Sequence, residues 1–322
     1  MKKNSFSHHS FYTHFSGYKT FALLFVATIV VGILTMGVSS DVNAKLKSPE
    51  IFSLIKAYDQ SFVEENDLYI PADAKNLLNS NITEEVFNQI IDKIYEIYSP
   101  VVKSKGGVLV IEKNWSDGTV NAYANRSGNT WSVAMFGGLA RHEAVTPDGF
   151  ALVICHELGH HLAGTPKVRN MFSRWASNEG QSDYFSTLKC LRQVMENDNN
   201  EEIIAKLSVP AYVDDLCTKS FVDANEIAIC KRSAMSGKSV GDLFVALSNG
   251  SKINFSTPDR SVVNRTNDSH PASQCRLDTY LAGATCIVDK KDELSDTNVN
   301  SGACTSINGH ESGLRPTCWY KP

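Results

Sequence analysis

The chain lacks features that mark several whole classes of protein. It has no dense basic tract and a formal net charge of -4, so nothing in it indicates a nucleic-acid partner. None of its eight cysteines belongs to a CxxC pair, which argues against a cysteine-based metal site. No internal repeat or low-complexity tract is present. With 322 residues and 42% hydrophobic content, the chain can bury one sizeable core or two small ones.

Long apolar runs are equally scarce, and the one stretch long enough to be a signal or a membrane anchor extends from Phe21 to Val38. Lysines precede it, and Val42-Asn43-Ala44 after it offers a small-residue cleavage site, an order that is typical of a secretory signal. Its length also approaches the ~20 residues that span a bilayer, so an uncleaved anchor is the alternative. We expect residues 1–44 to be a signal peptide or N-terminal membrane anchor, and the rest of the chain to be exported to the periplasm or the extracellular space.

The cysteines agree with export, because an oxidising compartment converts an even number of them into disulfides. Six of them lie in the last third of the chain: Cys217, Cys230, Cys275, Cys286, Cys304 and Cys318. Sequence alone does not determine which ones pair. Pairing of nearest neighbours closes short loops, and we therefore expect the pairs Cys217–Cys230, Cys275–Cys286 and Cys304–Cys318.

Hydrophobic periodicity predicts a helical region followed by strands. Residues 45–105 are expected to be helical, since apolar residues from Val86 to Tyr98 recur at helical spacing and Thr83 can cap their helix. Short apolar or alternating runs predict strands at Gly107–Glu112, which we expect to be buried, at Val120–Ala124 and at Thr130–Phe136.

Two helices are expected after the strands. Thr146 followed by Pro147 is typical of a helix start, and this helix contains the run FALVICHELGHHLA before it stops near Gly164. Another helix begins near Ser177. At least one more lies within residues 197–260, and beyond about Asp289 the chain becomes polar and rich in glycine, serine and asparagine.

The sharpest motif is His156-Glu157-Leu158-Gly159-His160. On a helix, His156 and His160 lie one turn apart on the same face, so both imidazoles can reach one metal ion. Glu157 sits beside that ion, where it can take a proton from a metal-activated water. Because the chain has nine histidines, such a pentapeptide arises by chance in roughly one chain in a hundred, so the motif needs support from its surroundings.

Two acidic residues provide that support. Glu179 follows His160 after 18 intervening residues, near the start of the next expected helix, and Asp183 lies one turn further on. Glu179 can complete the three protein ligands of a catalytic zinc, and Asp183 can hold the other N–H of a ligand histidine. The alternative is a solvated acidic pair that the helix dipole favours. The upstream motif favours the ligand set His156, His160 and Glu179, with one zinc ion per chain.

These residues resemble a known group. The spacing of HExxH and glutamate resembles gluzincin metallopeptidases, and residues 107–285 more closely resemble the family of HtpX and the CaaX prenyl proteases. The stretch NAYA (121–124), the strand Thr130–Phe136 and a GGL turn precede the HELGH helix in that family's order. EGQSD departs mildly from the family, which usually has alanine before the aspartate. Ser269-His270-Pro271 with Arg276 resembles the family's HP…R element.

The resemblance implies an α+β fold: a zincin-like metallopeptidase domain with a small mixed sheet and an active-site helix, mostly helical elsewhere. We place this domain at residues 106–290, after the helical segment 45–105 and before a cysteine-containing tail at 291–322. The implied function is a zinc-dependent endopeptidase that acts on envelope or extracellular proteins or peptides. Glu157 would be the general base, His270 would stabilise the oxyanion, and Arg276 would position that loop or counter nearby carboxylates.

The strand Thr130–Phe136 has two compatible interpretations. As an edge strand it would receive an extended substrate by backbone pairing along Trp131, Ser132, Val133, Ala134 and Met135. Alternatively, its alternate side chains fill the core. Other residues near the motif are expected to be structural. We interpret His142 and His161 as polar surface or locally hydrogen-bonded residues, and Cys155 can bridge to Cys190 if their two helices pack antiparallel.

A different class of function remains as the alternative, a non-catalytic zinc-stabilised binding or chaperone-like module. Glu157 argues against it, because a structural zinc site has no use for a general base. Hydrolysis of a non-peptide amide, such as a cell-wall crosslink, also stays open. The sequence does not name the substrate, the cleavage preference or the oligomeric state.

Overall fold

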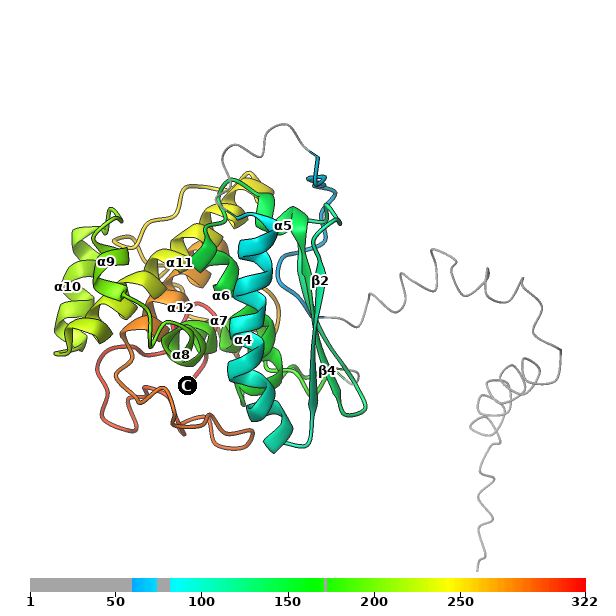
Figure 1. Ribbon diagram of the computed structural model, residues 1–322. Helices are drawn as coiled ribbons and strands as arrows, with labels where there is room; N and C mark the ends of the chain where they lie inside the picture. Colours follow the sequence, from blue (N-terminus) through cyan, green and yellow to red (C-terminus); the bar gives the residue numbers. More distant parts are fainter. Residues whose placement is uncertain (1–59, 74–81, 171–172) are drawn as a thin grey trace, which may run out of the picture. The chain divides into compact units, whose positions relative to one another are not determined.

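A computed structural model describes residues 60–73, 82–170 and 173–322 (Figure 1). The described residues all belong to one compact unit. The expected signal or anchor with its apolar run Phe21–Val38, and the first part of the expected helical segment 45–105, lie outside the described residues. Within the described part, no helix combines the length and apolarity that crossing a membrane requires.

A four-stranded mixed sheet forms one layer of the domain. Its strands have the spatial order β1-β3-β4-β2, with the bounds β1 Gln60–Ser61, β2 Val108–Asn114, β3 Ala122–Ser127 and β4 Thr130–Phe136. β4 runs parallel to β2 and antiparallel to β3, and β1 pairs antiparallel with the other edge of β3. Gly128 has a φ of +58° in the tight turn between β3 and β4, a conformation that glycine adopts without strain. The expected strand Thr130–Phe136 is confirmed with its bounds.

The strand β2 differs from its prediction as a buried strand. Val108 and Val110 are 54% and 38% exposed, whereas Leu109 is buried. The reason is position, because β2 is an outer strand of the sheet and only one of its faces packs on the helical layer. An apolar run therefore predicted the strand but not its exposure.

The helices gather on one face of the sheet (Figure 1). The longer ones are α4 Glu84–Ser104, α6 Pro147–Leu162, α10 Ala211–Ser220, α11 Ala224–Ser248 and α12 Ser273–Thr285. The shorter ones are α5 Gly137–Arg141, α7 Glu179–Phe185, α8 Leu191–Val194 and α9 Asn200–Ile204, and a π-helical turn Ser186–Cys190 joins α7 to α8. Of the expected helical segment, residues 60–73 form β1 and irregular chain, and α4 is the helical part.

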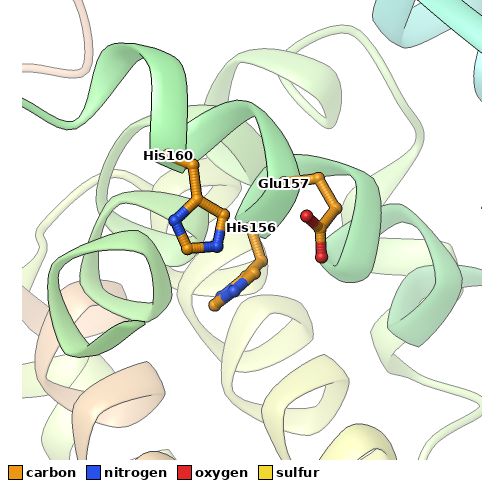
Figure 2. Close-up of side chains that lie close together, drawn as sticks. All are labelled: His156, Glu157 and His160. Atoms are coloured by element: carbon orange, nitrogen blue, oxygen red, sulfur yellow. The ribbon is translucent and has the colours of Figure 1, made fainter. Parts of the chain in front are cut away.

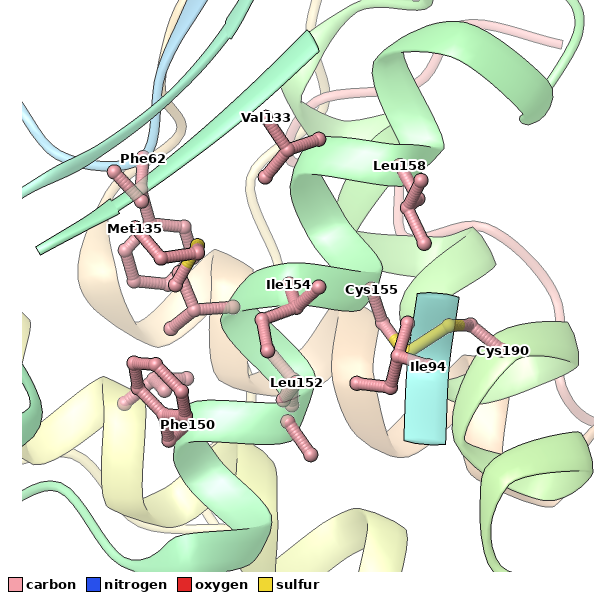
Figure 3. Close-up of a cluster of buried hydrophobic side chains, with 14 of the residues drawn as sticks. Phe62, Ile94, Val133, Met135, Phe150, Leu152, Ile154, Cys155, Leu158 and Cys190 are labelled. Atoms are coloured by element: carbon pink, nitrogen blue, oxygen red, sulfur yellow. A yellow bond between two sulfur atoms is a disulfide. The ribbon is translucent and has the colours of Figure 1, made fainter. Parts of the chain in front are cut away.

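Helix starts follow the expected capping chemistry. Thr83 Oγ1 accepts a hydrogen bond from Val86 N at the start of α4, and Thr146 Oγ1 accepts one from Gly149 N at the start of α6. α6 is buried almost all round, from Gly149 to His161. Figure 3 shows its apolar side chains packed with those of β4 and α4. The helix that carries the HExxH motif is therefore held from several sides.

Four disulfides join these elements: Cys155–Cys190, Cys217–Cys230, Cys275–Cys318 and Cys286–Cys304. The first two agree with expectation, and the first links α6 to the π-helical turn (Figure 3). The expected pairs Cys275–Cys286 and Cys304–Cys318 are wrong. Cys275 and Cys286 lie at opposite ends of α12, and a helix of that length holds them about 16 Å apart, too far for a disulfide.

The C-terminal tail is packed against α7. Trp319 is completely buried, and a Cβ on Gly180 would lie only 2.2 Å from its ring. Arg315 Nε donates to Gln181 Oε1 at 2.7 Å, and Tyr184 OH donates to the carbonyl of Gly313. The tail therefore makes specific contacts with α7 despite its polar composition, and the disulfides of Cys304 and Cys318 link it covalently to the domain.

Candidate metal centre

The HExxH motif lies near the C-terminal end of α6 (Figure 2). His156, Glu157 and His160 are completely buried, and each offers a candidate ligand atom within 4.8 Å of the others. The two imidazole rings meet edge to face with centroids 4.8 Å apart. Gly159 lets α7 approach, because a Cβ there would lie 2.9 Å from Ser182 Cα.

Glu179 is brought to these histidines by α7, of which it is the first residue. Asn178 caps that helix by accepting a hydrogen bond from Gln181 N. Glu179 Oε2 lies 3.2 Å from His156 Nε2, and Glu179 Oε1 lies 3.7 Å from His160 Nε2. The structure thus brings together the three residues that the sequence predicts as metal ligands.

Several polar atoms at this point have no hydrogen-bond partner although they are buried. They are His160 Nε2 and both carboxylate oxygens of Glu157, while Glu179 Oε2 lies at ion-pair distance, 3.2 Å, from both His156 Nε2 and His270 Nε2. Such groups ordinarily cost about 1–3 kcal/mol each when unsatisfied. Two imidazole nitrogens and one carboxylate are a donor set that zinc prefers, with a coordination position left for water. The residues therefore fit a zinc ion.

Each candidate ligand histidine is oriented through its Nδ1 atom. His156 Nδ1 donates to Asp183 Oδ1 at 2.7 Å, and His160 Nδ1 donates to the carbonyl of Ser177 at 2.8 Å. Because both acceptors lack a proton to give, each Nδ1 carries a proton, and Nε2 is the nitrogen left to bind a metal.

Asp183 accepts hydrogen bonds from two buried residues of α12. Arg276 donates to it twice, from Nε to Oδ2 and from Nη2 to Oδ1, both at 2.8 Å. Tyr280 OH donates to Oδ1 at 2.7 Å. Burial alone would raise the pKa of Asp183, but the charges of Arg276 and His156 outweigh it and hold that pKa at about 2. Arg276 thus counters a carboxylate that supports the metal site.

Tyr280 was not predicted as a site residue. It lies one helical turn after Arg276, so both side chains project from the same face of α12 toward Asp183. Helical spacing from Arg276 was the only sequence signal that could have identified it.

His270 borders the centre from the chain just before α12. It is partly buried, and its Nε2 lies 3.2 Å from Glu179 Oε2. The same nitrogen donates to the carbonyl of Ser61 at 2.7 Å. His270 therefore stands beside the ligand carboxylate with an N–H group that binds a peptide carbonyl.

The electrostatics of the centre favour a cation. Burial lowers the pKa of His160 to about 4, which keeps that ring neutral and able to ligate. Burial also opposes charge on His156, yet Asp183 and Glu179 raise its pKa to about 9. The negative field that holds a proton on His156 also attracts a divalent metal, which competes for the same nitrogen. Burial raises the pKa of Glu157 to about 8, against an opposing effect of His156.

The prediction that Thr130–Phe136 is a substrate-binding edge strand is wrong. β4 is an inner strand, paired with β2 on one side and β3 on the other along its length, so the backbone of residues Trp131, Ser132, Val133, Ala134 and Met135 is not free for a substrate. Alternation in the sequence revealed the strand but could not reveal its neighbours. The buried side chains of Trp131, Val133 and Met135 confirm the alternative, that they fill the core.

The two other histidines near the motif are buried rather than on the surface. His142 Nδ1 accepts a hydrogen bond from Ala144 N, and His161 is stacked between Trp131 and Trp175. Both serve local packing and hydrogen bonding. In the described ranges, the other candidate metal group comprises Asp259, Cys275 and Cys318, but those two cysteines form a disulfide and are not available as ligands.

Comparison with known proteins agrees with this centre. The model of peptidase family M48 matches residues 103–281. This range includes His156, Glu157, His160, Glu179, Asp183, His270, Arg276 and Tyr280, but not Ser61, whose carbonyl His270 binds. No curated protein and no solved structure gives a significant match. Because the family match covers more than half of the chain, the protein belongs to peptidase family M48, the HtpX and CaaX protease family of zincin metallopeptidases.

Proposed function

We propose that the protein is an exported, zinc-dependent endopeptidase that hydrolyses peptide bonds in proteins of the cell envelope or the extracellular space. Membership of family M48 supports a metallopeptidase. The observation that carries the proposal is the convergence of buried candidate ligand atoms from His156, His160 and Glu179 beside the unpaired carboxylate of Glu157.

His156, His160 and Glu179 would hold one zinc ion. When bound, zinc polarises a carbonyl group and lowers the pKa of water. Glu157 then accepts the proton of the attacking water and delivers it to the leaving amine. In the metal-free centre burial raises the pKa of Glu157 to about 8, and the positive charge of a bound zinc would lower that pKa and favour the ionised carboxylate that a general base requires.

His270 and Arg276 have different roles in this proposal. His270 offers an N–H that already binds a carbonyl oxygen at 2.7 Å, so the same group can stabilise the oxyanion of a substrate. Arg276 is buried and acts through Asp183, which orients His156, so we assign it a positioning role. Loss of Arg276 would disturb the metal site indirectly.

Export is supported by the predicted leader 1–44 and by four disulfides, which form in oxidising compartments. We therefore propose the periplasm or the extracellular space as the location, with an N-terminal anchor if the leader is not cleaved. The substrates would be proteins or peptides, and no feature of the chain indicates a nucleic-acid partner.

The decisive comparison is between the wild type and Glu157→Gln, with Glu143→Gln as a control at a solvent-exposed position. Zinc content is measured by elemental mass spectrometry, and hydrolysis is measured on an unfolded protein substrate. We expect all three proteins to hold about one zinc per chain and only Glu157→Gln to lose hydrolysis, by roughly a hundredfold or more. Unchanged hydrolysis in Glu157→Gln would refute the mechanism.

The binding-module alternative makes the opposite prediction for the wild type. A zinc-loaded wild type that hydrolyses no peptide would favour that alternative. A wild type that cannot be loaded with zinc, or a Glu179→Ala variant that holds zinc as tightly as the wild type, would contradict the proposed ligand set.

A further inference from the structure

The edge of β3 beside the metal centre is covered by the chain's own residues. In β1, Gln60 lies opposite Ala124 and Ser61 lies opposite Tyr123. The pairing continues one residue further, because Phe62 N donates to the carbonyl of Ala122 at 3.0 Å. Since β4 covers the other edge of β3, a peptide that pairs with β3 must take the place of β1.

Residues of the candidate site hold the backbone of this segment. His270 Nε2 donates to the Ser61 carbonyl at 2.7 Å, and Arg276 Nη1 donates to the next carbonyl, that of Phe62, at 2.8 Å. Val63 then exchanges two hydrogen bonds with the side-chain amide of Asn121, at 3.2 and 3.1 Å. Three successive residues are thus bound through main-chain groups, which is how an extended peptide is recognised with little demand on its sequence.

One side chain of the segment occupies a defined pocket. Phe62 is completely buried, and its ring meets the ring of His156 edge to face at 5.1 Å. Phe244 lies 5.3 Å away, and the guanidinium of Arg276 lies 4.9 Å from the Phe62 ring. The pocket therefore fits a large apolar side chain, and it follows directly after the carbonyl that His270 binds.

Space continues beyond this point. A cavity of about 310 Å³ adjoins the segment and is lined by Val63, Glu64, Phe244, Pro271 and Arg276, among others. Residues 63–66 line part of this cavity, so a peptide that took their place would run along it.

We propose that Gln60–Val63 occupies the position of a peptide substrate. Substrates would pair antiparallel with β3, place a large apolar residue in the Phe62 pocket immediately after the scissile carbonyl, and bind only when β1 has left. The inference rests on the proposed function, since the interaction with His270 identifies the scissile carbonyl. It assigns β1 as a tethered occupant that competes with substrate at high effective concentration.

The test locks β1 in place. Ser61 and Tyr123 are directly opposite each other, and the hydrogen bond at Phe62 makes theirs a non-hydrogen-bonded pair, the closer kind of cross-strand pair and one that a disulfide can bridge. The full chain carries Ser61→Cys and Tyr123→Cys together with Glu157→Gln, so that bound peptide is not cleaved. A fluorescent peptide with the sequence of Gln60–Asn66 is the probe, and its affinity is measured by anisotropy.

We expect the peptide to bind the reduced protein and to bind the oxidised, locked protein about tenfold more weakly or worse. Each single cysteine variant, in the same background, should bind equally in both redox states. Mass spectrometry checks that the four native disulfides survive the mild reduction. Equal affinity in the locked and reduced double variant, or no binding in either, would overturn the inference.

A second comparison tests the pocket without changing the protein. The same peptide with Phe62→Ala should bind the reduced protein about tenfold more weakly, because it leaves the apolar pocket empty. Equal affinity of the two peptides would overturn the assigned selectivity.

Failure of this inference can be distinguished from failure of the proposed function. Redox-dependent binding combined with a zinc-loaded wild type that cleaves no peptide would support strand binding and reject the peptidase. Equal cleavage by the locked and reduced forms of the double variant that keeps Glu157 would reject only the present inference.

Discussion

Asp183 Oδ1 accepts the Nδ1 proton of His156 at 2.7 Å, and this contact turns the Nε2 atom of the histidine toward Glu179. The carboxylate reaches the histidine from a different helix, so the contact also fixes α7 against α6. The orientation of one candidate metal ligand, His156, thus depends on Asp183, which does not touch the proposed metal position, and this dependence can be measured.

Asp183→Asn should weaken zinc binding by about 10- to 100-fold, because the amide is a poorer acceptor for His156 and leaves its ring less well oriented. The variant should also lose roughly 3–5 kcal/mol of stability, since it leaves the buried charge of Arg276 without its partner. Competition with a chromogenic chelator measures the affinity. Asp242→Asn, at a partly exposed carboxylate paired with Lys238, is the control. Equal zinc affinity in Asp183→Asn and the wild type would contradict the assignment.

Two buried tyrosines, Tyr280 and Tyr98, allow a matched test of the hydrogen bond from Tyr280 to Asp183. Tyr280→Phe removes the donor to Asp183 and should cost about 1.5–3 kcal/mol, as is usual for a hydrogen bond to a charged group. Tyr98 is equally buried, but its hydroxyl has no hydrogen-bond partner, so Tyr98→Phe should be neutral or stabilising. Urea unfolding of the zinc-free proteins measures both. Similar losses in the two variants would show that the contact with Asp183 is not what matters.

Asp278 should make stability depend on pH between about 4 and 6. Burial raises its pKa to about 6 in the folded protein, from a usual value of 3.8. Within this range the folded state keeps the proton while the unfolded state has lost it, so the free energy of unfolding falls as the pH rises. Asp278→Asn lacks this proton, and its stability relative to the wild type should therefore improve between pH 4 and pH 6. Parallel curves for the two proteins would contradict the raised pKa.

The disulfide beside the motif should matter for metal binding as well as for stability. Replacing Cys155 and Cys190 together by alanine should cost about 2–5 kcal/mol and should also weaken zinc binding, because Cys155 adjoins His156 on α6. The matched control replaces Cys217 and Cys230, whose disulfide joins α10 to α11 away from the ligands. That control should lose stability but keep its zinc affinity. Equal zinc affinity in both double variants would contradict the proposed support of the metal site.

Local features of the fold could be predicted from the sequence because local chemistry determines them. The cap at Thr146, the proline after it and the alternation of β4 each correspond to a structural element with the expected start or bounds. The HExxH spacing places His156 and His160 on one face for the same reason. Glu179 could be proposed as a ligand because the segment between α6 and α7 is short enough to bring Glu179 back to the histidines of α6.

Long-range relationships could not be predicted in this way. β4 is an inner strand because β2, which is separated from it in the sequence by β3, pairs with one of its edges. The contact of His270 with Ser61 joins residues about 200 positions apart, and no periodic pattern encodes it. The correct partners of Cys275 and Cys286 likewise depend on how the tail folds back over α12.

The packing of the tail has a consequence for the order of events during synthesis. α7, which provides Glu179, rests on Trp319 and Arg315, and Cys275 at the start of α12 is tied to Cys318. Arg315, Cys318 and Trp319 are translated well over a hundred residues after Glu179. A nascent chain therefore carries both motif histidines long before it can hold the third ligand in place. The contacts that Arg315 and Trp319 make with α7 therefore come late in synthesis, so the helix that carries the motif is made well before the residues that support Glu179.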